Sequence, residues 1–389
     1  MLNTKALQRA ALVYEENCSS YERRPKRWYN VTNDDWQSAS WQMQNRLRSP
    51  DDFEGVFELS ASEKSAIQRA ATSFSVGLTP HFAALIRPEL AENCPIRLQS
   101  IAKSQEFEAR AESELLDPLG EEAHSILACV TQRYPDRALI YTNSDCAVRC
   151  RHCTRKRKVG IAPSPSLEQI NAAIHYIGEQ PQIRDVLISG GDPLVWPNSV
   201  IAAWLERLRA FAHIDVIRLC TRMPSSMPQR IDEELCRILE NYAPIYVQTQ
   251  FNHYLELCAE SEAALHALRR SGAVLSNQSV LLRKVNDSAE ALEKLNRRLL
   301  RSGCKPYYLF NLDRAFGTSH FRVDLKSAMQ IMDALRGRVS GLAIPQFVVD
   351  LPGGYGKVPL CPQNIVEGKF GERLKFRNWY GEILEYNDF

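Results

Sequence analysis

The order of hydrophobic and polar positions divides the chain into two parts. Residues 1 to about 110 predict mostly helix, and we interpret Trp28, Trp36 and Trp41 as packing anchors there. From residue 131 onward, short apolar runs alternate with amphipathic stretches, which predicts alternating strands and helices. The expected strands lie near 138–143, 185–189, 215–221, 245–250, 274–282 and 305–312. The expected helices lie near 167–179, 198–211, 230–240, 260–271 and 288–302.

Six successive strand–helix units predict an α/β fold with a parallel sheet covered on both faces. We expect this sheet to curl into a partial (β/α)6 barrel. The chain then divides into a helical N-terminal region at 1–125, the barrel at 126–320 and a C-terminal segment at 321–389. Because chemistry in such folds gathers at the carboxyl ends of strands, motifs that directly follow a predicted strand are the candidates for function.

Local spacings in the N-terminal region predict where helices begin. Thr32 is followed by Asp35 and Ser60 by Glu63, which are capping patterns, and Thr79 precedes a proline at the start of another helix. The first of these helices is expected to carry both Trp36 and Trp41. Residues 103–124 are acidic and polar, and we interpret them as a surface helix and connector.

Three cysteines follow the first predicted strand, in the stretch YTNSDCAVRCRHCTRKRKVG at 141–160. Cys146, Cys150 and Cys153 have the spacing C-x3-C-x2-C. Three thiolates can hold a 4Fe–4S cluster and leave the fourth iron open for a small ligand. A structural zinc site is the alternative, but it needs four ligands, usually as two spaced pairs, and His152 inside the loop is awkwardly placed to be the fourth. The spacing resembles the signature of radical S-adenosylmethionine (SAM) enzymes, in which the open iron binds SAM.

Composition and charge narrow the function classes. The net charge of the chain is +2, which argues against a nucleic-acid partner, although the basic run at 149–158 is an alternative patch of that kind. The sequence has no apolar run of membrane-spanning length, and Glu15 and Glu16 interrupt the N-terminal apolar residues. Eleven cysteines without a secretion signal indicate reduced thiols. We therefore expect a cytoplasmic protein with no membrane partner.

A small-residue turn follows the second predicted strand. It consists of Ser189, Gly190, Gly191 and Asp192, ahead of a proline. Glycines let the backbone approach a ligand without a side-chain clash, although a plain tight turn has the same composition. After a cysteine loop of this spacing, the turn resembles the motif that holds the methionyl amine of SAM.

The motif PGGYGK, at 352–357, ends on Lys357. It is not a phosphate-binding P-loop, because that pattern requires glycine where Leu351 stands and serine or threonine where Val358 stands. A lysine on a flexible glycine turn suits a Schiff base with an aldehyde, and desolvation would make its amine nucleophilic. A surface lysine in a loop is the alternative.

Two arginines surround a tyrosine just before the first predicted strand. Arg133, Tyr134 and Arg137 lie in the segment TQRYPDR. Two guanidinium groups in this arrangement can clamp a phosphate. A solvated basic turn is the alternative.

Together, the cysteine loop, RYPDR and PGGYGK resemble the lysine 2,3-aminomutase family, radical SAM enzymes that also use pyridoxal phosphate (PLP). The resemblance runs across most of the chain, through WQMQNRLRS, DPLGE, ISGGDPL, NQSVLLRKVND, GTSHFR and QFVVDLPGG. It implies that the cysteines hold the cluster and that Gln278 lies near SAM. It also implies that Lys357 carries PLP, whose phosphate Arg133, Tyr134 and Arg137 bind.

The resemblance further implies the substrate contacts. Arg155 matches an arginine that pairs with the substrate carboxylate, and Asp313 and Asp350 match two aspartates that hold the distal ammonium group of lysine. Two carboxylates suit a cation, because a buried cation without a partner is costly. We therefore expect a free basic L-amino acid as substrate, most simply lysine converted to β-lysine, with flavodoxin or ferredoxin as electron donor.

Departures from the family pattern leave alternatives open. Tyr355 interrupts the glycines before the lysine, Gln250 stands where the family commonly has histidine, and Lys284 replaces a glycine. Arginine is an alternative substrate for the same chemistry, and radical desaturation of arginine or lysine is an alternative reaction. A lysine-modifying enzyme for a protein partner is a further alternative. The sequence also leaves open whether the chain forms a homo-oligomer.

Overall fold

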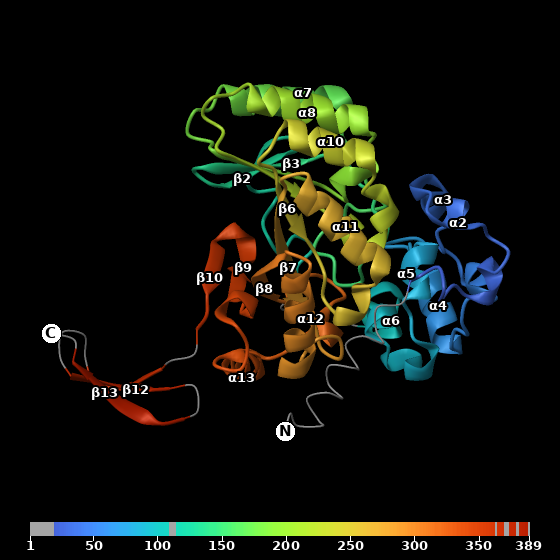
Figure 1. The fold of residues 1–389 in the computed structure, drawn as a ribbon. Helices are drawn as coiled ribbons and strands as arrows, with labels where there is room; N and C mark the ends of the chain where they lie inside the picture. The colour runs from blue at the N-terminus through green and yellow to red at the C-terminus, as the bar shows by residue number, and fades with distance from the viewer. Residues whose placement is uncertain (1–18, 109–113, 362–363, 369–372, 379–380, 388–389) are drawn as a thin grey trace.

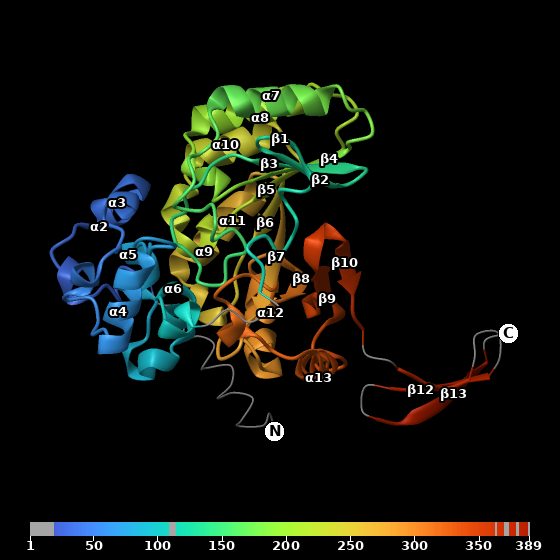
Figure 2. The same ribbon diagram turned by 180° about the vertical axis from the view of Figure 1, so that it is seen from behind.

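The computed structural model describes residues 19–108, 114–361, 364–368, 373–378 and 381–387 (Figure 1). Its main feature is a ten-stranded sheet whose strands lie side by side in chain order, from β1 to β10. A separate three-stranded sheet contains β11, β12 and β13. Figures 1 and 2 show the N-terminal helices on one side of the large sheet and the small sheet on the other.

Most of the large sheet is parallel. Its parallel strands are β3 (Arg137–Tyr141), β4 (Asp185–Ser189), β5 (Val216–Cys220), β6 (Tyr246–Thr249), β7 (Val274–Leu281), β8 (Lys305–Asn311) and β9 (Gln346–Leu351). The antiparallel strands β1 (Ser125–Leu127), β2 (Val130–Tyr134) and β10 (Gly356–Pro359) lie at its two ends. The end strands β1 and β10 are not paired with each other in the described strand order, so the barrel is partial. The predicted α/β architecture is confirmed.

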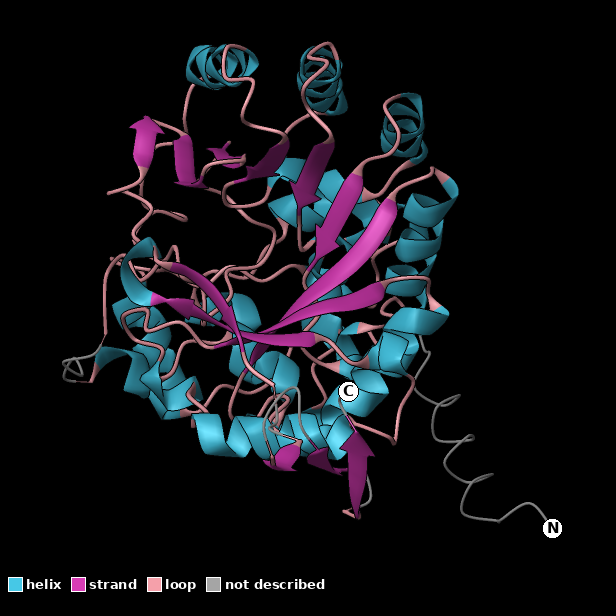
Figure 3. Ribbon diagram, turned by 90° about the vertical axis from the view of Figure 1, so that its left-hand side faces the viewer, coloured by secondary structure: helices cyan, strands magenta, loops and turns pink. Residues whose placement is uncertain are grey.

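Helices line the outside of this curved sheet (Figure 3). They are α7 (Leu167–Gly178), α8 (Asn198–Arg209), α9 (Met223–Ser226), α10 (Glu233–Asn241), α11 (Ala259–Arg270), α12 (Ala289–Arg301) and α13 (Leu325–Leu335). The amphipathic pattern explains their placement: α12 buries Leu292, Leu295 and Leu299, which share one helical face. The five helices predicted between the strands are present with shifted ends, the largest shift being the start of α10 at Glu233.

The N-terminal region has its own apolar core, which includes Trp28 and Trp36. Its helices are α2 (Asn33–Trp36), α3 (Ala39–Gln44), α4 (Ala61–Ala70), α5 (Pro80–Ala84) and α6 (Pro95–Ser100). The side chains of Thr32, Ser60 and Thr79 cap α2, α4 and α5 as predicted. The prediction that one helix carries both Trp36 and Trp41 is wrong. The helix α2 ends at Trp36, and Ser38 caps the next helix, α3, which carries Trp41.

Short 3-10 helices and the remaining strands complete the described chain. The 3-10 helices are η1 (Lys26–Trp28), η2 (Pro50–Phe53), η3 (Pro88–Asn93), η4 (Ser104–Phe107), η5 (Pro193–Val195), η6 (Pro228–Arg230), η7 (Tyr254–Glu256), η8 (Ser319–Phe321), η9 (Gly341–Ala343) and η10 (Pro352–Gly354). The small sheet consists of β11 (Ile365–Glu367), β12 (Arg373–Arg377) and β13 (Ile383–Asn387). Within the described residues, no helix is long and apolar enough to cross a membrane.

The acidic stretch at 103–124 differs from the sequence interpretation. Only η4 is helical in its described part, and residues 109–113 lie outside the description. Glu106, Glu114 and Glu121 are buried instead of facing solvent. Glu106 pairs with Arg151 at 2.7 Å and Glu121 with Arg155 at 2.6 Å. The stretch therefore neutralises the basic run beside the cysteines, which weakens the interpretation of that run as a nucleic-acid patch.

Candidate active site

The carboxyl ends of the parallel strands open into a cavity of about 520 Å³. Every predicted site residue lines it, including residues that lie more than 200 positions apart in the chain, such as Arg133 and Lys357. The predicted residues that it brings together are Arg133, Tyr134, Arg137, Cys146, Cys150, Cys153, Arg155, Ser189, Gly190, Gly191, Asp192, Gln278, Asp313, Asp350 and Lys357.

The three cysteines of the loop after β3 are free thiols. Burial, followed by the charge of Asp192, raises the pKa of Cys146 well above its ordinary value, and burial raises the pKa of Cys153 to about 11. A thiolate in such a place needs a positively charged partner. A metal centre meets this need, because its binding replaces the thiol protons. The donor set therefore fits an iron–sulfur cluster, whose iron the three sulfurs would hold.

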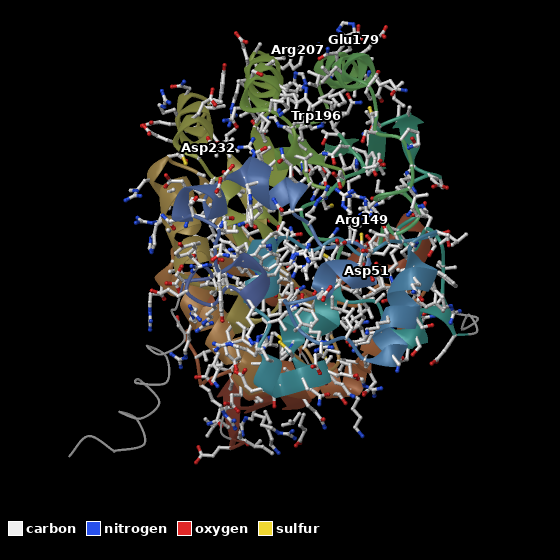
Figure 4. The ribbon with its side chains drawn as sticks, turned by 90° about the vertical axis from the view of Figure 1, so that its right-hand side faces the viewer. Asp51, Arg149, Glu179, Trp196, Arg207 and Asp232 are labelled. Carbon is white, nitrogen blue, oxygen red and sulfur yellow. The ribbon has the colours of Figure 1, made fainter. Side chains whose placement is uncertain are left out.

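Neighbouring segments hold the cysteine loop on both sides. Arg46 donates to the Asp145 carboxylate at 2.9 Å and to the Cys146 carbonyl at 2.6 Å. Arg149, labelled in Figure 4, meets the N-terminal region, where its backbone N–H donates to the Gly77 carbonyl at 2.9 Å. These contacts explain how segments between the N-terminal helices help to shape the loop.

The glycine turn after β4 packs directly on the chain before Cys146. Gly190 has a φ of 141°, and a Cβ atom there would come 2.8 Å from the backbone N of Asn143. At Gly191 a Cβ atom would come 2.1 Å from the carbonyl oxygen of Asp145. Both positions therefore require glycine, because the neighbouring atoms belong to backbone that cannot rotate away. The turn supports the cysteine loop in addition to any ligand contact.

Asp192 ends this turn inside a closed set of hydrogen bonds. Its carboxylate accepts from the Thr221 hydroxyl at 2.8 Å, the Arg222 backbone N–H at 2.8 Å and the Leu194 backbone N–H at 3.0 Å. Burial raises the pKa of Asp192 to about 6, although these bonds oppose the rise. The side chain thus ties the turn after β4 to the segment after β5.

Arg155 lies between the cysteine loop and the glycine turn. Its Nη1 donates to Ser189 Oγ at 3.1 Å and to the Gly190 carbonyl at 2.9 Å, and its Nη2 donates to Glu121 Oε1 at 2.6 Å. The sequence interpretation missed Glu121 as a cavity residue. The signal was present in DPLGE, where this acid ends one of the stretches that resemble the aminomutase family.

Lys357 lies in β10 and also lines the cavity. The glycine turn that precedes it is η10, whereas Lys357 itself is paired in the hairpin with β9, so the expectation of a lysine on a flexible turn is wrong. Its Nζ lies 3.2 Å from Asp350 Oδ2, and its backbone N–H donates to the Tyr134 hydroxyl at 3.0 Å. Arg133 also pairs with Asp350, at 3.1 Å.

Other predicted residues complete the lining. Burial, followed by the charge of Asp350, raises the pKa of Asp313 to about 7. Gln278 donates to Gln248 Oε1 at 2.9 Å. Arg137 pairs with its neighbour Asp136 at 2.9 Å. Aromatic and basic residues that the sequence analysis did not single out also line the cavity, among them Arg218, Tyr307, Tyr308 and Phe310.

A second group of metal-type side chains lies where the N-terminal region meets the start of α11. The ligand atoms of His81, Cys258 and Glu260 are within 4.8 Å of one another. However, Glu260 Oε1 already accepts from Ser19 Oγ at 2.5 Å and from Ser20 Oγ at 3.0 Å, and Ser20 Oγ is 2.9 Å from His81 Nδ1. We interpret the group as a hydrogen-bonded anchor for residues 19–20.

Two family profiles match parts of this chain. The profile of the radical SAM superfamily matches residues 140–295, which span the cysteine loop and the strands up to β7, and a profile described as lysine-2,3-aminomutase matches residues 332–388. Radical SAM proteins use a 4Fe–4S cluster and SAM, for which the cysteine loop offers the donor set.

Full-length relatives extend the match to nearly the whole chain. L-lysine 2,3-aminomutase of Fusobacterium nucleatum is 39% identical over 366 residues, which cover 94% of this chain and 85% of the relative. The L-lysine 2,3-aminomutase of Methanococcus maripaludis is 41% identical, covering 92% and 83%. Glutamate 2,3-aminomutase of Clostridioides difficile is 39% identical, covering 97% and 89%. The chain therefore belongs to the lysine 2,3-aminomutase family of radical SAM enzymes.

Proposed function

We propose that the protein is a PLP-dependent 2,3-aminomutase whose substrate is a free basic L-amino acid, with lysine converted to β-lysine. The observation that carries this proposal is the pair Asp313 and Asp350 on the wall that also holds Lys357. After burial, the negative charge of Asp350 contributes most to the raised pKa of Asp313, while the charges of Lys357 and Arg133 oppose the rise. A cationic side chain relieves this repulsion, whereas a glutamate side chain would add a third negative charge.

Sequence identity alone does not choose between these substrates. The glutamate 2,3-aminomutase of Clostridioides difficile and the L-lysine 2,3-aminomutase of Fusobacterium nucleatum are each 39% identical to this chain. The two carboxylates, Asp313 and Asp350, are the feature that favours a basic substrate, and in this structure Arg133 and Lys357 pair with Asp350. A planar guanidinium also fits two carboxylates, so arginine is the second candidate.

The cavity residues have complementary tasks in this proposal. Arg155, beside the cysteines, binds the α-carboxylate of the amino acid. Asp313 and Asp350 bind the cation at the far end, and Asp313 gives up its proton when the cation binds. The substrate is thereby held at both ends, which fixes the position of the carbons between them.

The fit of the lysine wall to PLP rests on its charges. Lys357 has an amine in the cavity, and the cationic side chains of Arg133 and Arg137 line the same wall, where a phosphate would find partners. When bound, the cluster with SAM supplies a radical that removes a hydrogen atom, and PLP supplies a ring system that stabilises the substrate radical. The chain positions the reactants and keeps water from them.

The test is a substrate screen with product identification. Protein reconstituted with iron, sulfide, SAM, PLP and dithionite is incubated separately with lysine, arginine and glutamate. We expect lysine to give an isomer of unchanged mass, identified as β-lysine by NMR. Turnover of arginine alone would replace the substrate assignment. A product two mass units lighter than its substrate would replace migration by desaturation.

A further inference from the structure

Arg222, directly after β5, points its guanidinium group at one of the three cysteines. Its Nη1 donates to Cys150 Sγ at 2.6 Å. The side chain is only 7% exposed, so this contact is shielded from water. A cationic donor on the sulfur of a cluster cysteine is both a positional constraint and a source of positive potential.

Three further contacts hold Arg222 in this orientation. Nη2 donates to Gln99 Oε1 at 2.8 Å and to Glu256 Oε2 at 3.0 Å, and the backbone N–H donates to Asp192 Oδ2 at 2.8 Å. Glu256 is fully buried. The guanidinium is thus fixed from one side by an acid and an amide, which leaves the Nη1 side directed at the sulfur.

One donor of Arg222 remains open. Its Nε is buried and has no hydrogen-bond partner among the described residues. A buried unpaired N–H costs free energy, and a charged group makes the cost larger. The Nε–H of an arginine lies on the same edge as Nη2, which here faces Gln99 and Glu256. The contact of Nη1 with Cys150 Sγ is therefore the observation that carries the inference.

We propose that Arg222 positions Cys150 and raises the reduction potential of the 4Fe–4S cluster that the three cysteines would hold. Reduction adds one electron to the cluster, so a fixed positive charge stabilises the reduced form more than the oxidised form. Hydrogen bonds to the sulfurs and the net charge nearby are among the features that set such potentials. Glu256 carries the opposite charge behind Arg222 and limits the rise.

The proposal rests on the family assignment and does not depend on which amino acid is the substrate. The test therefore uses no amino acid. Wild-type, R222Q, R222K and R97Q proteins are reconstituted with iron and sulfide and titrated with dithionite, and electron paramagnetic resonance follows the reduced cluster. R97Q is the matched control, because Arg97 is also 7% exposed and pairs with a buried glutamate, Glu63. Glu63 still has a cationic partner in this variant, because Lys103 lies 2.7 Å from it.

We expect the midpoint potential of R222Q to be more negative than that of wild type and R97Q to equal wild type. R222K keeps the charge but cannot span Cys150, Gln99 and Glu256, so its midpoint should lie between R222Q and wild type. R222Q with full iron content and a wild-type midpoint would overturn the proposal. If R222Q folds by circular dichroism but takes up little iron, the decision passes to R222K, and an unshifted midpoint there overturns it.

Discussion

Lys357 and Asp350 face each other across the antiparallel hairpin of β9 and β10. They are register partners, and Nζ lies 3.2 Å from the Oδ2 atom. The glycines of the connecting turn allow this hairpin to form. Gly354 has a φ of 86°, and a Cβ atom there would come 2.6 Å from the ring of His124. Hairpin register therefore determines where the amine of Lys357 lies in the cavity.

The first prediction concerns this amine. In K357A, protein incubated with PLP and desalted should lose the visible absorbance of lysine-bound PLP, because no other lysine of the described residues lines the cavity. K284A is the control, since Lys284 is exposed and does not line the cavity. The measurement is an absorbance spectrum before and after borohydride reduction, with mass spectrometry of the labelled peptide. A label on another lysine in wild type would refute the assignment of Lys357.

The second prediction is a pH dependence of substrate binding. Burial, followed by the charge of Asp350, raises the pKa of Asp313 to about 7. The carboxyl group is neutral below this pH and ionised above it, and only the ionised form attracts a cation. Affinity for a basic amino acid should therefore rise by up to about tenfold per pH unit below pH 7 and level off above it. Calorimetric titration between pH 5.5 and pH 8.5 measures this slope.

D313N is the control for the pH dependence. Its amide cannot ionise, so the slope below pH 7 should disappear and the affinity should stay low throughout. If D313N keeps the slope of the wild-type protein, another group titrates and Asp313 does not contact the cation.

The local parts of this site were predictable, whereas the long-range pairs were not. The cysteine spacing and the glycine turns lie within single loops, and parallel strands bring the ends of those loops together. Glu121 and Arg155 are 34 residues apart, and Glu106 and Arg151 are 45 apart. The polar sequence around these acids predicts exposure, because periodicity does not reveal which charges find a buried partner.

The edges of the sheet also escaped the sequence analysis. The strand β1 is only 3 residues long, and β2, with the sequence VTQRY, buries only Val130 and is largely polar, so neither gives a clear apolar pattern. Arg133 and Tyr134 therefore lie in β2, where a turn before the first strand was one interpretation. Tyr134 in β2 accepts a hydrogen bond from the backbone N–H of Lys357 in β10. Both strands pair antiparallel with their neighbours and lie near opposite ends of the strand order, so the sequence pattern did not reveal the contact.

The third prediction tests the support that the glycine turn gives to the cysteines. In G191A the added methyl group would lie 2.1 Å from the Asp145 carbonyl oxygen, so the loop before Cys146 must move. We expect a loss of about 1–3 kcal/mol in stability and clearly reduced iron uptake. G341A is the control, because a Cβ at Gly341 meets nothing within 4 Å. Iron analysis after reconstitution and thermal melting measure both effects, and equal iron in the two variants would contradict the prediction.

The fourth prediction concerns the pair between Glu121 and Arg155. Removing one partner of a buried ion pair leaves the other charge uncompensated, which costs about 3–5 kcal/mol. The free energy of unfolding of E121Q, measured by chemical denaturation, should therefore be lower than that of wild type by an amount in this range. Hydrogen bonds that the amide retains would make the loss smaller. The adjacent E122Q is the control: Glu122 is 62% exposed and pairs with Arg157 at the surface, so its loss should cost less than about 1 kcal/mol. Equal costs for the two variants would mean that the buried pair contributes no more than the exposed one.

The last prediction is a stabilising substitution away from the cavity. Lys284 has a φ of 64°, in the left-handed region that favours glycine. A side chain there costs about 1–2 kcal/mol, of which glycine returns part through its larger freedom in the unfolded chain. K284G should therefore raise the free energy of unfolding by about 0.5–1 kcal/mol. R283G is the control, because Arg283 is an exposed neighbour without a positive φ and should lose stability from the same change. Chemical denaturation of the two variants beside wild type gives opposite signs if backbone strain at Lys284 is the cause, and a loss in both would show that its side chain contributes more than the strain costs.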